Sequence, residues 1–423
     1  MSREQTLIAP ALVASLAEAA VSRFLHYVRI DTQSDEDSTS YPSTSKQLDL
    51  LRQLVAECLA LGLEDVLCDG HGYVTAAIPA TVEHEVPTIA FFAHVDTSPS
   101  VSGAGVEPQR VRYSGGTLPL GQSKHALDPA VSPELDRHVG HDLVTTDGTT
   151  LLGADDKAGV AEIMAAAEYL TSHPEVPHGR ILLAFNPDEE IRRGVIHFPV
   201  ETFGAFAAYT LDGGTAGLLE GETFSGAQVR LTIRGRAIHA GWAKGELVNA
   251  IKLAGAILER LPTDRLSPET TEGREGFVHP AVIQGQASSV ELRINVRDFD
   301  DGTLDEHVDF VRRLAADVAA SEPRCSIETE TIVHFRNPRR ALDRSPEIVE
   351  NLETAIRRVG LEPKRAVLRG GTDGSLLTEM GLPTANIFTG AQDAHSEREW
   401  VCVEDMGLAA ATIVELVQVW AGS

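Results

Sequence analysis

The chain has 423 residues, of which 43% are hydrophobic and 23% are charged. These values are typical of a folded globular protein that is long enough for two domains. The net charge is −26, with 62 acidic residues against 36 lysines and arginines. This balance argues against nucleic acid or an anionic membrane as a partner, because both require basic surfaces.

The cysteines and the N-terminal segment bear on the compartment. The four cysteines are scattered and form no CxxC pair: Cys58, Cys68, Cys325 and Cys402. Residues 1–20 lack a basic stretch followed by an apolar core and a cleavage site. No apolar run approaches the roughly 18 residues of a membrane span. We therefore expect a cytoplasmic protein without disulfides, signal peptide or membrane segment.

The N-terminal part begins with two helices and two strands. Apolar periodicity predicts helices over residues 9–30 and 47–61, with a polar loop at 31–45 between them. Strands are predicted at 74–80 and 88–97, and the second is a near-continuous apolar run, typical of burial on both faces.

The second of these strands ends in His94 and Asp96, which share one face of an extended chain. A histidine ligand oriented by a carboxylate would have this pattern. For the isolated pair, a structural hydrogen bond is the simpler explanation.

Residues 147–159, DGTTLLGADDKAG, place Asp155 and Asp156 directly before a predicted helix at 160–172. The preceding segment, 98–146, is rich in Gly, Pro and Ser, which predicts a long ordered loop or a small subdomain. Carboxylates that enter a core need a partner, and a divalent cation is the usual one. An acid that caps the helix would explain one of the two but not both.

Two further predicted strands also end in acids. The strand that starts at Arg180 ends in Asp188, Glu189 and Glu190, and residues 206–214 end in Asp212. Of two adjacent glutamates, one can bind a metal while the other acts as a general base. Acids are also favoured at helix N-termini, which explains the run of acids equally well in isolation. Four such ends at one edge of a parallel sheet, however, favour a bound cation.

From residue 223 the pattern changes to alternating strands with helices at 248–261 and 304–320, and a loop at 262–280. We predict an inserted α+β domain with an antiparallel sheet over 223–334. His239 follows its first strand, either near substrate or as an ordinary half-exposed histidine. After residue 335 the α/β pattern returns, with a helix at 345–360, a strand at 385–388, His395 behind it, and a closing helix at 404–422. Residues 1–222 and 335–423 would then form one discontinuous domain.

The candidate metal ligands comprise two histidines and three carboxylates, and Asp96 and Glu189 lie beside them: His94, Asp155, Glu190, Asp212 and His395. This set of ligands suits zinc, cobalt or manganese. With one bridging carboxylate it can hold two ions about 3.5–4 Å apart, an arrangement used for hydrolysis.

Eight motifs, followed by His395, resemble in order and spacing those of the peptidase T family, over essentially the whole chain. These motifs are HVDTSP, TDGTTLLGADDKAG, NPDEEI, LDGG, HAGWAKG, TTEGREGF, RDFD and RGGTDGS. That family consists of tripeptide aminopeptidases within a zinc-dependent group that also contains carboxypeptidases, aminoacylases and desuccinylases. The resemblance implies an α/β zinc-exopeptidase-like catalytic domain, with a mixed, mostly parallel sheet between helices, and an inserted lid domain.

The resemblance also implies roles for the metal ligands and their neighbours. His94 and Asp212 would bind one zinc ion, Glu190 and His395 the other, and Asp155 would bridge them. Co²⁺ or Mn²⁺ can substitute in such centres, and the Asp155–Asp156 peptide is often cis.

For the other residues, the resemblance implies that Asp96 orients His94. Glu189 would take a proton from the attacking water and deliver it to the leaving amine. His239, on the lid, would stabilise the oxyanion, and Arg297 and Arg369 would anchor substrate. In dimeric relatives the lid histidine comes from the partner subunit, which leaves open a homodimer through the lid domain.

Several positions depart from the family pattern. Ala240 replaces a usual proline, Arg192 and Arg193 stand where a glycine is usual, and Ala391 and Asp393 replace a glycine and an asparagine. None of these changes removes a ligand or the base. The expected function is release of the N-terminal residue from short peptides, most simply tripeptides. The alternative is another amidohydrolase of the same fold, a dipeptidase or an N-acyl amino acid deacylase.

Overall fold

The computed structural model describes residues 8–423, which form two compact units. The first unit runs to Gly221 and resumes at Arg340–Ala366 and Thr372–Ser423. The second comprises Glu222–Arg339 and Val367–Gly371. The predicted insert, 223–334, thus lies within the second unit, which extends beyond it. The N-terminal segment considered above for a signal peptide begins with residues 1–7, which lie outside the described residues.

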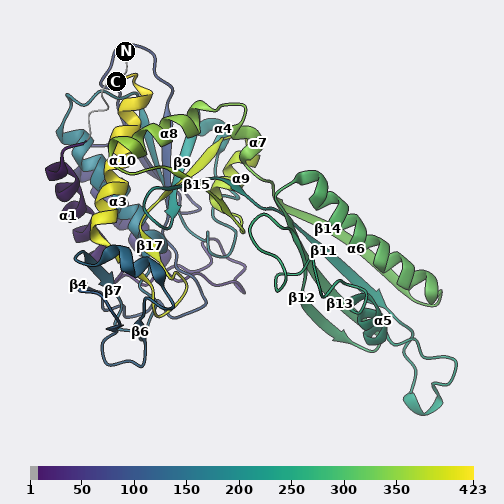
Figure 1. Cartoon of the computed structure of the whole chain (residues 1–423). Coiled ribbons are helices and arrows are strands. Elements are labelled where there is room, and N and C mark those ends of the chain that lie inside the picture. Colours follow the sequence, from purple (N-terminus) through teal and green to yellow (C-terminus); the bar gives the residue numbers. More distant parts are fainter. Residues whose placement is uncertain (1–7) are drawn as a thin grey trace. The chain divides into compact units, whose positions relative to one another are not determined.

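An eight-stranded mixed sheet forms the centre of the first unit (Figure 1). Its order is β1 (Glu64–Cys68), β2 (Val74–Ile78), β8 (Ile181–Asn186), β3 (Ile89–His94), β9 (Ala207–Gly213), β16 (Thr384–Phe388), β10 (Leu218–Thr223) and β15 (Lys364–Leu368). The four strands β8, β3, β9 and β16 pair in parallel, whereas β2 and β10 join them in antiparallel fashion. The predicted mixed α/β sheet is confirmed, and its parallel strands end at one common edge.

Helices cover both faces of this sheet. One face packs against α1 (Pro10–Tyr27), α2 (Gln47–Ala60), α3 (Ala154–Ser172), α8 (Glu347–Arg358) and α10 (Val403–Trp420). The other face packs against α4 (Val200–Phe203) and α9 (Asp373–Glu379). The sequence of strand β3 is apolar throughout because its side chains are buried on both faces of the sheet. Phe91 enters the first core and Phe92 the second.

Residues 98–146 form a small subdomain, one of the two forms predicted for them. A second sheet has the order β17 (Ala391–Gln392), β18 (Trp400–Cys402), β7 (Asp142–Thr145) and β4 (Gln109–Arg112). Beside it lie the pair β5 (Leu118–Pro119) and β6 (Ala126–Leu127) and the 3₁₀ helix η1 (Pro133–His138). The subdomain has its own apolar cluster, which includes Tyr113, Leu135 and Trp400. Strand β18, from the C-terminal part of the chain, therefore pairs into a sheet whose other long strands, β4 and β7, lie more than 250 residues earlier.

The second unit is a four-stranded antiparallel sheet with helices packed against it (Figure 1). The strand order is β12 (Phe277–Gln286), β13 (Ser289–Asp298), β11 (Ser225–Arg234) and β14 (Ser326–Phe335). Helices α5 (Ala250–Leu258) and α6 (Asp301–Ser321) contribute to the core, and η2 (Ala240–Trp242) is short. The short helix α7 (Arg339–Leu342) begins at the end of this unit and lies mostly in the first unit, where Leu342 is buried. The predicted antiparallel α+β module is confirmed.

The loop prediction for residues 262–280 was wrong at its end, because β12 already begins at Phe277. Strand β12 lies at the sheet edge, and its residues from Pro280 onward are exposed, so burial imposes no alternation. Pro280 lies beside a bulge, a position where an edge strand tolerates proline. Strand β1, also exposed and at an edge, had not been predicted for the same reason.

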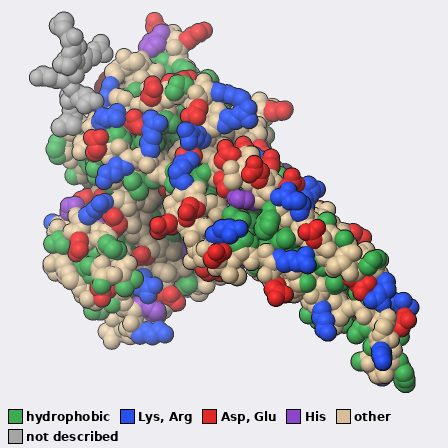
Figure 2. Space-filling view, turned by 45° about the vertical axis from the view of Figure 1, so that its right-hand side comes forward, with side chains coloured by type: hydrophobic (Ala, Val, Ile, Leu, Met, Phe, Trp, Pro, Cys, Tyr) green, Lys and Arg blue, Asp and Glu red, His purple; other side chains and the backbone are tan. Residues whose placement is uncertain are grey.

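None of the helices between residues 8 and 423 combines the length and hydropathy needed to cross a bilayer. Lysine and arginine side chains are interspersed with acidic ones on the face shown in Figure 2.

Candidate metal centre

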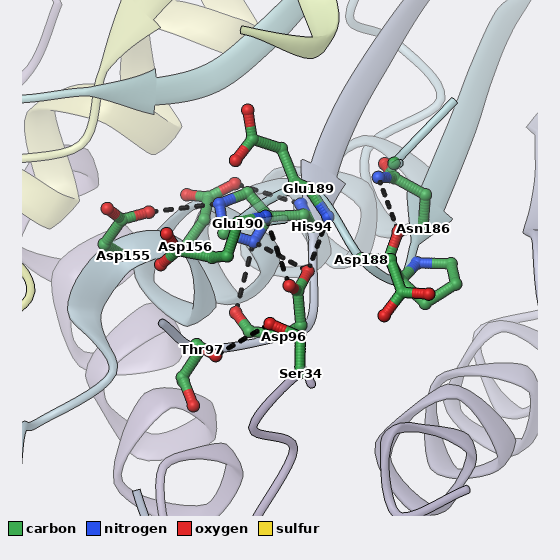
Figure 3. A network of polar contacts seen from close by, with 12 residues as sticks. Ser34, His94, Asp96, Thr97, Asp155, Asp156, Asn186, Asp188, Glu189 and Glu190 are labelled. Carbon is green, nitrogen blue, oxygen red and sulfur yellow. Dashed lines mark hydrogen bonds and ion pairs between the residues drawn. The ribbon is translucent and has the colours of Figure 1, made fainter. Parts of the chain in front are cut away.

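His94 is the last residue of β3 and is almost completely buried, with 3% of its surface exposed. Its Nδ1 lies 3.1 Å from the Asp96 carbonyl oxygen and 3.3 Å from Asp96 Oδ1. Its Nε2 faces Asp155, at 3.0 Å from Oδ1 (Figure 3). The same nitrogen lies 3.9 Å from Asp212 Oδ1. Because Asp96 occupies Nδ1, Nε2 is the nitrogen available for a metal.

Asp96 has a second function in this geometry. Its carboxylate is fully buried and accepts hydrogen bonds from the backbone N–H groups of Glu189, at 2.9 Å, and Glu190, at 3.2 Å. One carboxylate therefore fixes both the His94 ring and the turn that carries the two glutamates. The two explanations offered for the His94–Asp96 pair are compatible, since the structural hydrogen bond also orients a candidate ligand.

The Asp155–Asp156 pair begins α3 with non-helical backbone and a cis peptide bond, as the resemblance implied. The helix is capped by Gly153, whose φ is 82°, and no side-chain capping hydrogen bond is present. The capping explanation for these acids is therefore wrong. The two oxygens of Asp155 face different imidazoles, with Oδ1 at 3.0 Å from His94 Nε2 and Oδ2 at 3.2 Å from His395 Nε2. This is the arrangement expected of a carboxylate that bridges two ions.

Two adjoining groups of potential ligand atoms result. His94, Glu189 and Asp212 form one, and Asp155, Glu190 and His395 form the other. Within each group the candidate atoms all lie within 4.8 Å of one another. The five predicted ligands are thus brought together. Glu189 lies in the first group as well, so the geometry places it where either a ligand or a proton acceptor could act.

Glu190 is the clearest sign that a cation belongs here. Its Oε2 lies 2.8 Å from His395 Nε2, whereas its Oε1 is buried and has no hydrogen-bond partner. A buried carboxylate oxygen without a partner is costly, and a cation would satisfy it. Two imidazoles and several carboxylates also form a donor set that suits borderline divalent metals. The residues present therefore fit a centre for two divalent ions.

The pKa shifts of the site residues indicate an excess of buried negative charge. Burial raises the pKa of Glu189 and of Glu190 to about 8, and it raises that of Asp212 well above its usual value. Burial alone would lower the pKa of His94, but hydrogen bonds with Asp155 and Asp96 raise it well above its usual value. Hydrogen bonds with Asp155 and Glu190 raise the pKa of His395 to about 10. Without a cation, Glu189, Glu190 and Asp212 thus tend to stay protonated, and the two imidazoles stay charged beside Asp155, whose pKa they lower.

Three supporting residues were not predicted as part of the site. Asp156 Oδ2 accepts the backbone N–H of His94 at 3.1 Å, and Asn386 Oδ1 accepts that of Asp212 at 3.0 Å. Glu399 accepts three backbone N–H groups of the ligand loop, from Leu152 at 2.8 Å, Gly153 at 2.7 Å and Asp155 at 2.9 Å. Asp156 could have been inferred from the paired acids, but Glu399 follows no apolar strand and carried no such signal.

His239, Arg297 and Arg369 belong to the second unit. His239 is exposed, its Nδ1 accepts the N–H of Gly241 at 3.2 Å, and its ring lies 4.4 Å from that of Trp242. Arg297 is buried and donates to the carbonyls of Ala227 at 3.2 Å and Val296 at 3.0 Å.

Arg369 donates to the carbonyls of Gly273 at 3.0 Å and Glu275 at 2.9 Å. Both arginines thus have partners within their own unit. Their roles in substrate binding, and that of His239, stay predictions.

Comparison with known proteins agrees with this geometry. Residues 140–419 match the model of peptidase family M20/M25/M40. The chain is 44% identical to Peptidase T of Geobacillus thermodenitrificans over 407 residues, 96% of this chain and 99% of that protein. It is also 44% identical to Peptidase T of Shouchella clausii over 401 residues, 95% of this chain and 98% of that protein.

Solved structures share the fold. Aminopeptidase PepT from Bacillus cereus superposes with a TM-score of 0.74 at 22% identity, covering 96% of this chain and 99% of that one. A dinuclear metal binding peptidase from Bacillus subtilis superposes with a TM-score of 0.65 at 16% identity, covering 96% and 98%. Together with the sequence matches, these likenesses establish that the chain belongs to peptidase family M20/M25/M40.

Proposed function

We propose that this protein is a metal-dependent aminopeptidase that releases the N-terminal residue of tripeptides. The observation that carries the proposal is the Asp155 carboxylate, whose two oxygens face His94 and His395 at 3.0 and 3.2 Å. A carboxylate shared between two ligand groups suits a two-ion hydrolytic centre. The preference for tripeptides is supported by the relatives named Peptidase T and by a structural neighbour from Staphylococcus aureus described as a tripeptidase.

We propose that His94 and Asp212 hold one ion, Glu190 and His395 hold the other, and Asp155 bridges them. When bound, two zinc ions would supply Lewis acidity at the scissile carbonyl and would make a water molecule more acidic. Zinc is proposed because two imidazoles and three carboxylates suit it, and cobalt or manganese could replace it.

Glu189 is proposed as the proton carrier. Its backbone N–H is held by Asp96 at 2.9 Å, and its side chain belongs to the group with His94 and Asp212. Burial raises its pKa to about 8, so the carboxyl is suited both to accept a proton from water and to return it to the leaving amine. His239 would stabilise the oxyanion, and Arg297 and Arg369 would anchor substrate.

The role of Glu189 is tested with Glu189→Gln, which keeps the size of the side chain but cannot accept the proton. We expect kcat for a tripeptide to fall by about 10²–10⁴-fold. The metal content should stay unchanged, whereas a loss of one ion would identify Glu189 as a ligand. Glu201→Gln, at an exposed glutamate of α4, is the matched control. Near-normal turnover by Glu189→Gln would refute the mechanism.

Substrate class is tested with a tripeptide, its matching dipeptide and an N-acetyl amino acid, each with and without chelator. Cleavage of the free tripeptide that chelator abolishes and zinc or cobalt restores would support the proposal. A better rate on the dipeptide or on an N-acyl amino acid would move the enzyme to another amidohydrolase class with the same fold. Activity that resists chelator would refute the metal-dependent mechanism.

We further propose a cytoplasmic location and a homodimer formed through the second unit. All four cysteines are free, which suits a reducing compartment. Strand β12 is an edge strand with exposed Val282 and Ile283, which could pair with a second copy. Light scattering of the purified protein would test the dimer, and a monomeric mass at micromolar concentration would refute it.

A further inference from the structure

A second group of potential metal ligands lies in the small subdomain of the first unit, apart from the residues assigned above. It consists of His138, His141 and Cys402, whose candidate ligand atoms all lie within 4.8 Å of one another. His138 ends η1, His141 follows it directly before β7, and Cys402 ends β18. Strand β18 pairs with β7 and places Cys402 opposite Leu143. The sheet thus brings together two sequence segments more than 250 residues apart.

The spacing of these atoms suits a tetrahedral ion. Cys402 Sγ lies 3.8 Å from His141 Nδ1. Two ligands of one zinc ion, with Zn–S near 2.3 Å and Zn–N near 2.0–2.1 Å, are separated by about 3.6 Å in tetrahedral geometry. The observed contact is close to that separation. The competing explanation is a protonated thiol with weak contacts to His141 Nδ1 and to Glu404 Oε2, to which the Cys402 Sγ donates at 3.5 Å.

A carboxylate that could serve as a fourth ligand lies beside His138, at the start of α10. Asp405 Oδ2 lies 3.6 Å from His138 Nε2, which is too long for a hydrogen bond. The residue is 5% exposed, and this oxygen has no hydrogen-bond partner. Asp405 lies in the first turn of α10, three residues after Cys402, which is the N-cap residue of that helix.

His138 supplies the second unsatisfied atom. The residue is 6% exposed, and its Nδ1 is buried without a hydrogen-bond partner. His138, which belongs to the group with His141 and Cys402, and its neighbour Asp405 thus each carry a buried polar atom without a hydrogen-bond partner.

We propose that His138, His141, Cys402 and Asp405 form a separate structural site for one divalent cation of the zinc type. Four protein ligands that include a thiolate and two imidazoles match a closed, structural zinc site. Such an ion would join η1 and β7 to β18 and α10. Glu399, which holds the backbone of the Asp155 loop, directly precedes β18. The proposal does not depend on the peptide substrate proposed above.

Cobalt(II) provides a selective probe, because the candidate catalytic centre has nitrogen and oxygen ligands only. The full-length protein, stripped with chelator, is titrated with Co²⁺, and the thiolate-to-cobalt charge-transfer absorption is recorded in the near ultraviolet. We expect wild type to show this band. We expect Cys402→Ser to lose the band and to bind one metal equivalent fewer by elemental analysis. Cys68→Ser, at an exposed thiol of the same unit, should keep both.

His141→Gln covers the case in which Cys402→Ser does not fold, because it keeps the thiol. We expect it to bind cobalt at this site at least about tenfold more weakly, with an unchanged far-ultraviolet circular dichroism spectrum. Absence of the band in wild type would overturn the proposal and leave the protonated thiol as the explanation. Persistence of the band in Cys402→Ser would overturn it equally, since another thiol would then be the ligand.

Discussion

Substitution of Asp96 by asparagine tests the link between the folded backbone and the metal centre. The Asp96 carboxylate accepts backbone N–H groups from Glu189 and Glu190, one on each oxygen, and Oδ1 lies 3.3 Å from His94 Nδ1. Asparagine keeps one oxygen and turns an NH₂ group toward the other donor. One buried N–H then loses its acceptor, at a cost of about 1–3 kcal/mol in the free energy of unfolding.

The effect on metal binding is separate. Carboxylates that support a metal-binding histidine typically contribute 10–100-fold to metal affinity or activity. A loss in this range corresponds to about 1.4–2.8 kcal/mol of binding free energy. We therefore expect Asp96→Asn to weaken zinc binding by this factor and to lower activity in metal-limited buffer.

The assay combines urea unfolding in chelator, which reports stability without metal, with activity in metal-buffered solutions. Asp69→Asn is the matched control, because Asp69 also accepts two backbone N–H groups and lies 3.6 Å from His71 Nδ1. Asp69 accepts both hydrogen bonds on Oδ1, and asparagine keeps one such oxygen. We therefore expect little change in stability or in metal binding for Asp69→Asn. If Asp96→Asn lost stability but bound zinc as tightly as wild type, the proposed orientation of His94 would be refuted.

Three further predictions follow from the same structure. Glu162→Gln should stabilise the protein at pH 8, because burial raises the pKa of Glu162 well above its usual value and neither carboxyl oxygen has a partner. An acid with a raised folded-state pKa binds more protons when folded, so wild-type stability falls by up to about 1.4 kcal/mol per pH unit above the unfolded pKa. Urea unfolding should show the advantage at pH 8 and its disappearance near pH 4, and equal stability at both values would contradict the assignment.

Asp393→Ala should lower stability by about 1–3 kcal/mol, because Trp400 Nε1 donates to Asp393 Oδ2 at 3.3 Å. Asp393→Asn should retain that acceptor and tolerate the φ of 53°, and thermal unfolding that does not distinguish the two variants would rule out this contact. Finally, saturating zinc at about 100 times its Kd should add about 2.7 kcal/mol to stability, which chelator should remove in a thermal-shift assay.

Strand ends were the part of the site that the sequence could reveal. His94, Glu189, Glu190 and Asp212 follow apolar runs, and the parallel pairing of β3, β8 and β9 brings their ends to one sheet edge. Buried parallel strands are recognisable because both faces pack against helices. The motif resemblance supplied the division of the ligands between two ions and the expected cis bond, which periodicity could not.

The edges of both sheets were less predictable. Strands β1 and β12 expose most of their side chains, so burial leaves no pattern in their sequence. Their existence depends on backbone hydrogen bonds to β2 and β13, which any residue other than proline can make.

The sequence by itself determined the order of the elements, the two kinds of sheet and the strand-end ligands, because each depends on burial that repeats along a short segment. Only the tertiary structure decided which distant side chains meet. It placed the two oxygens of Asp155 toward His94 and His395, brought Glu399 to the Asp155 loop, and set Cys402 beside His141. These contacts join loops and strand ends that are far apart in the chain, and they depend on sheet order and register, which no local periodicity records.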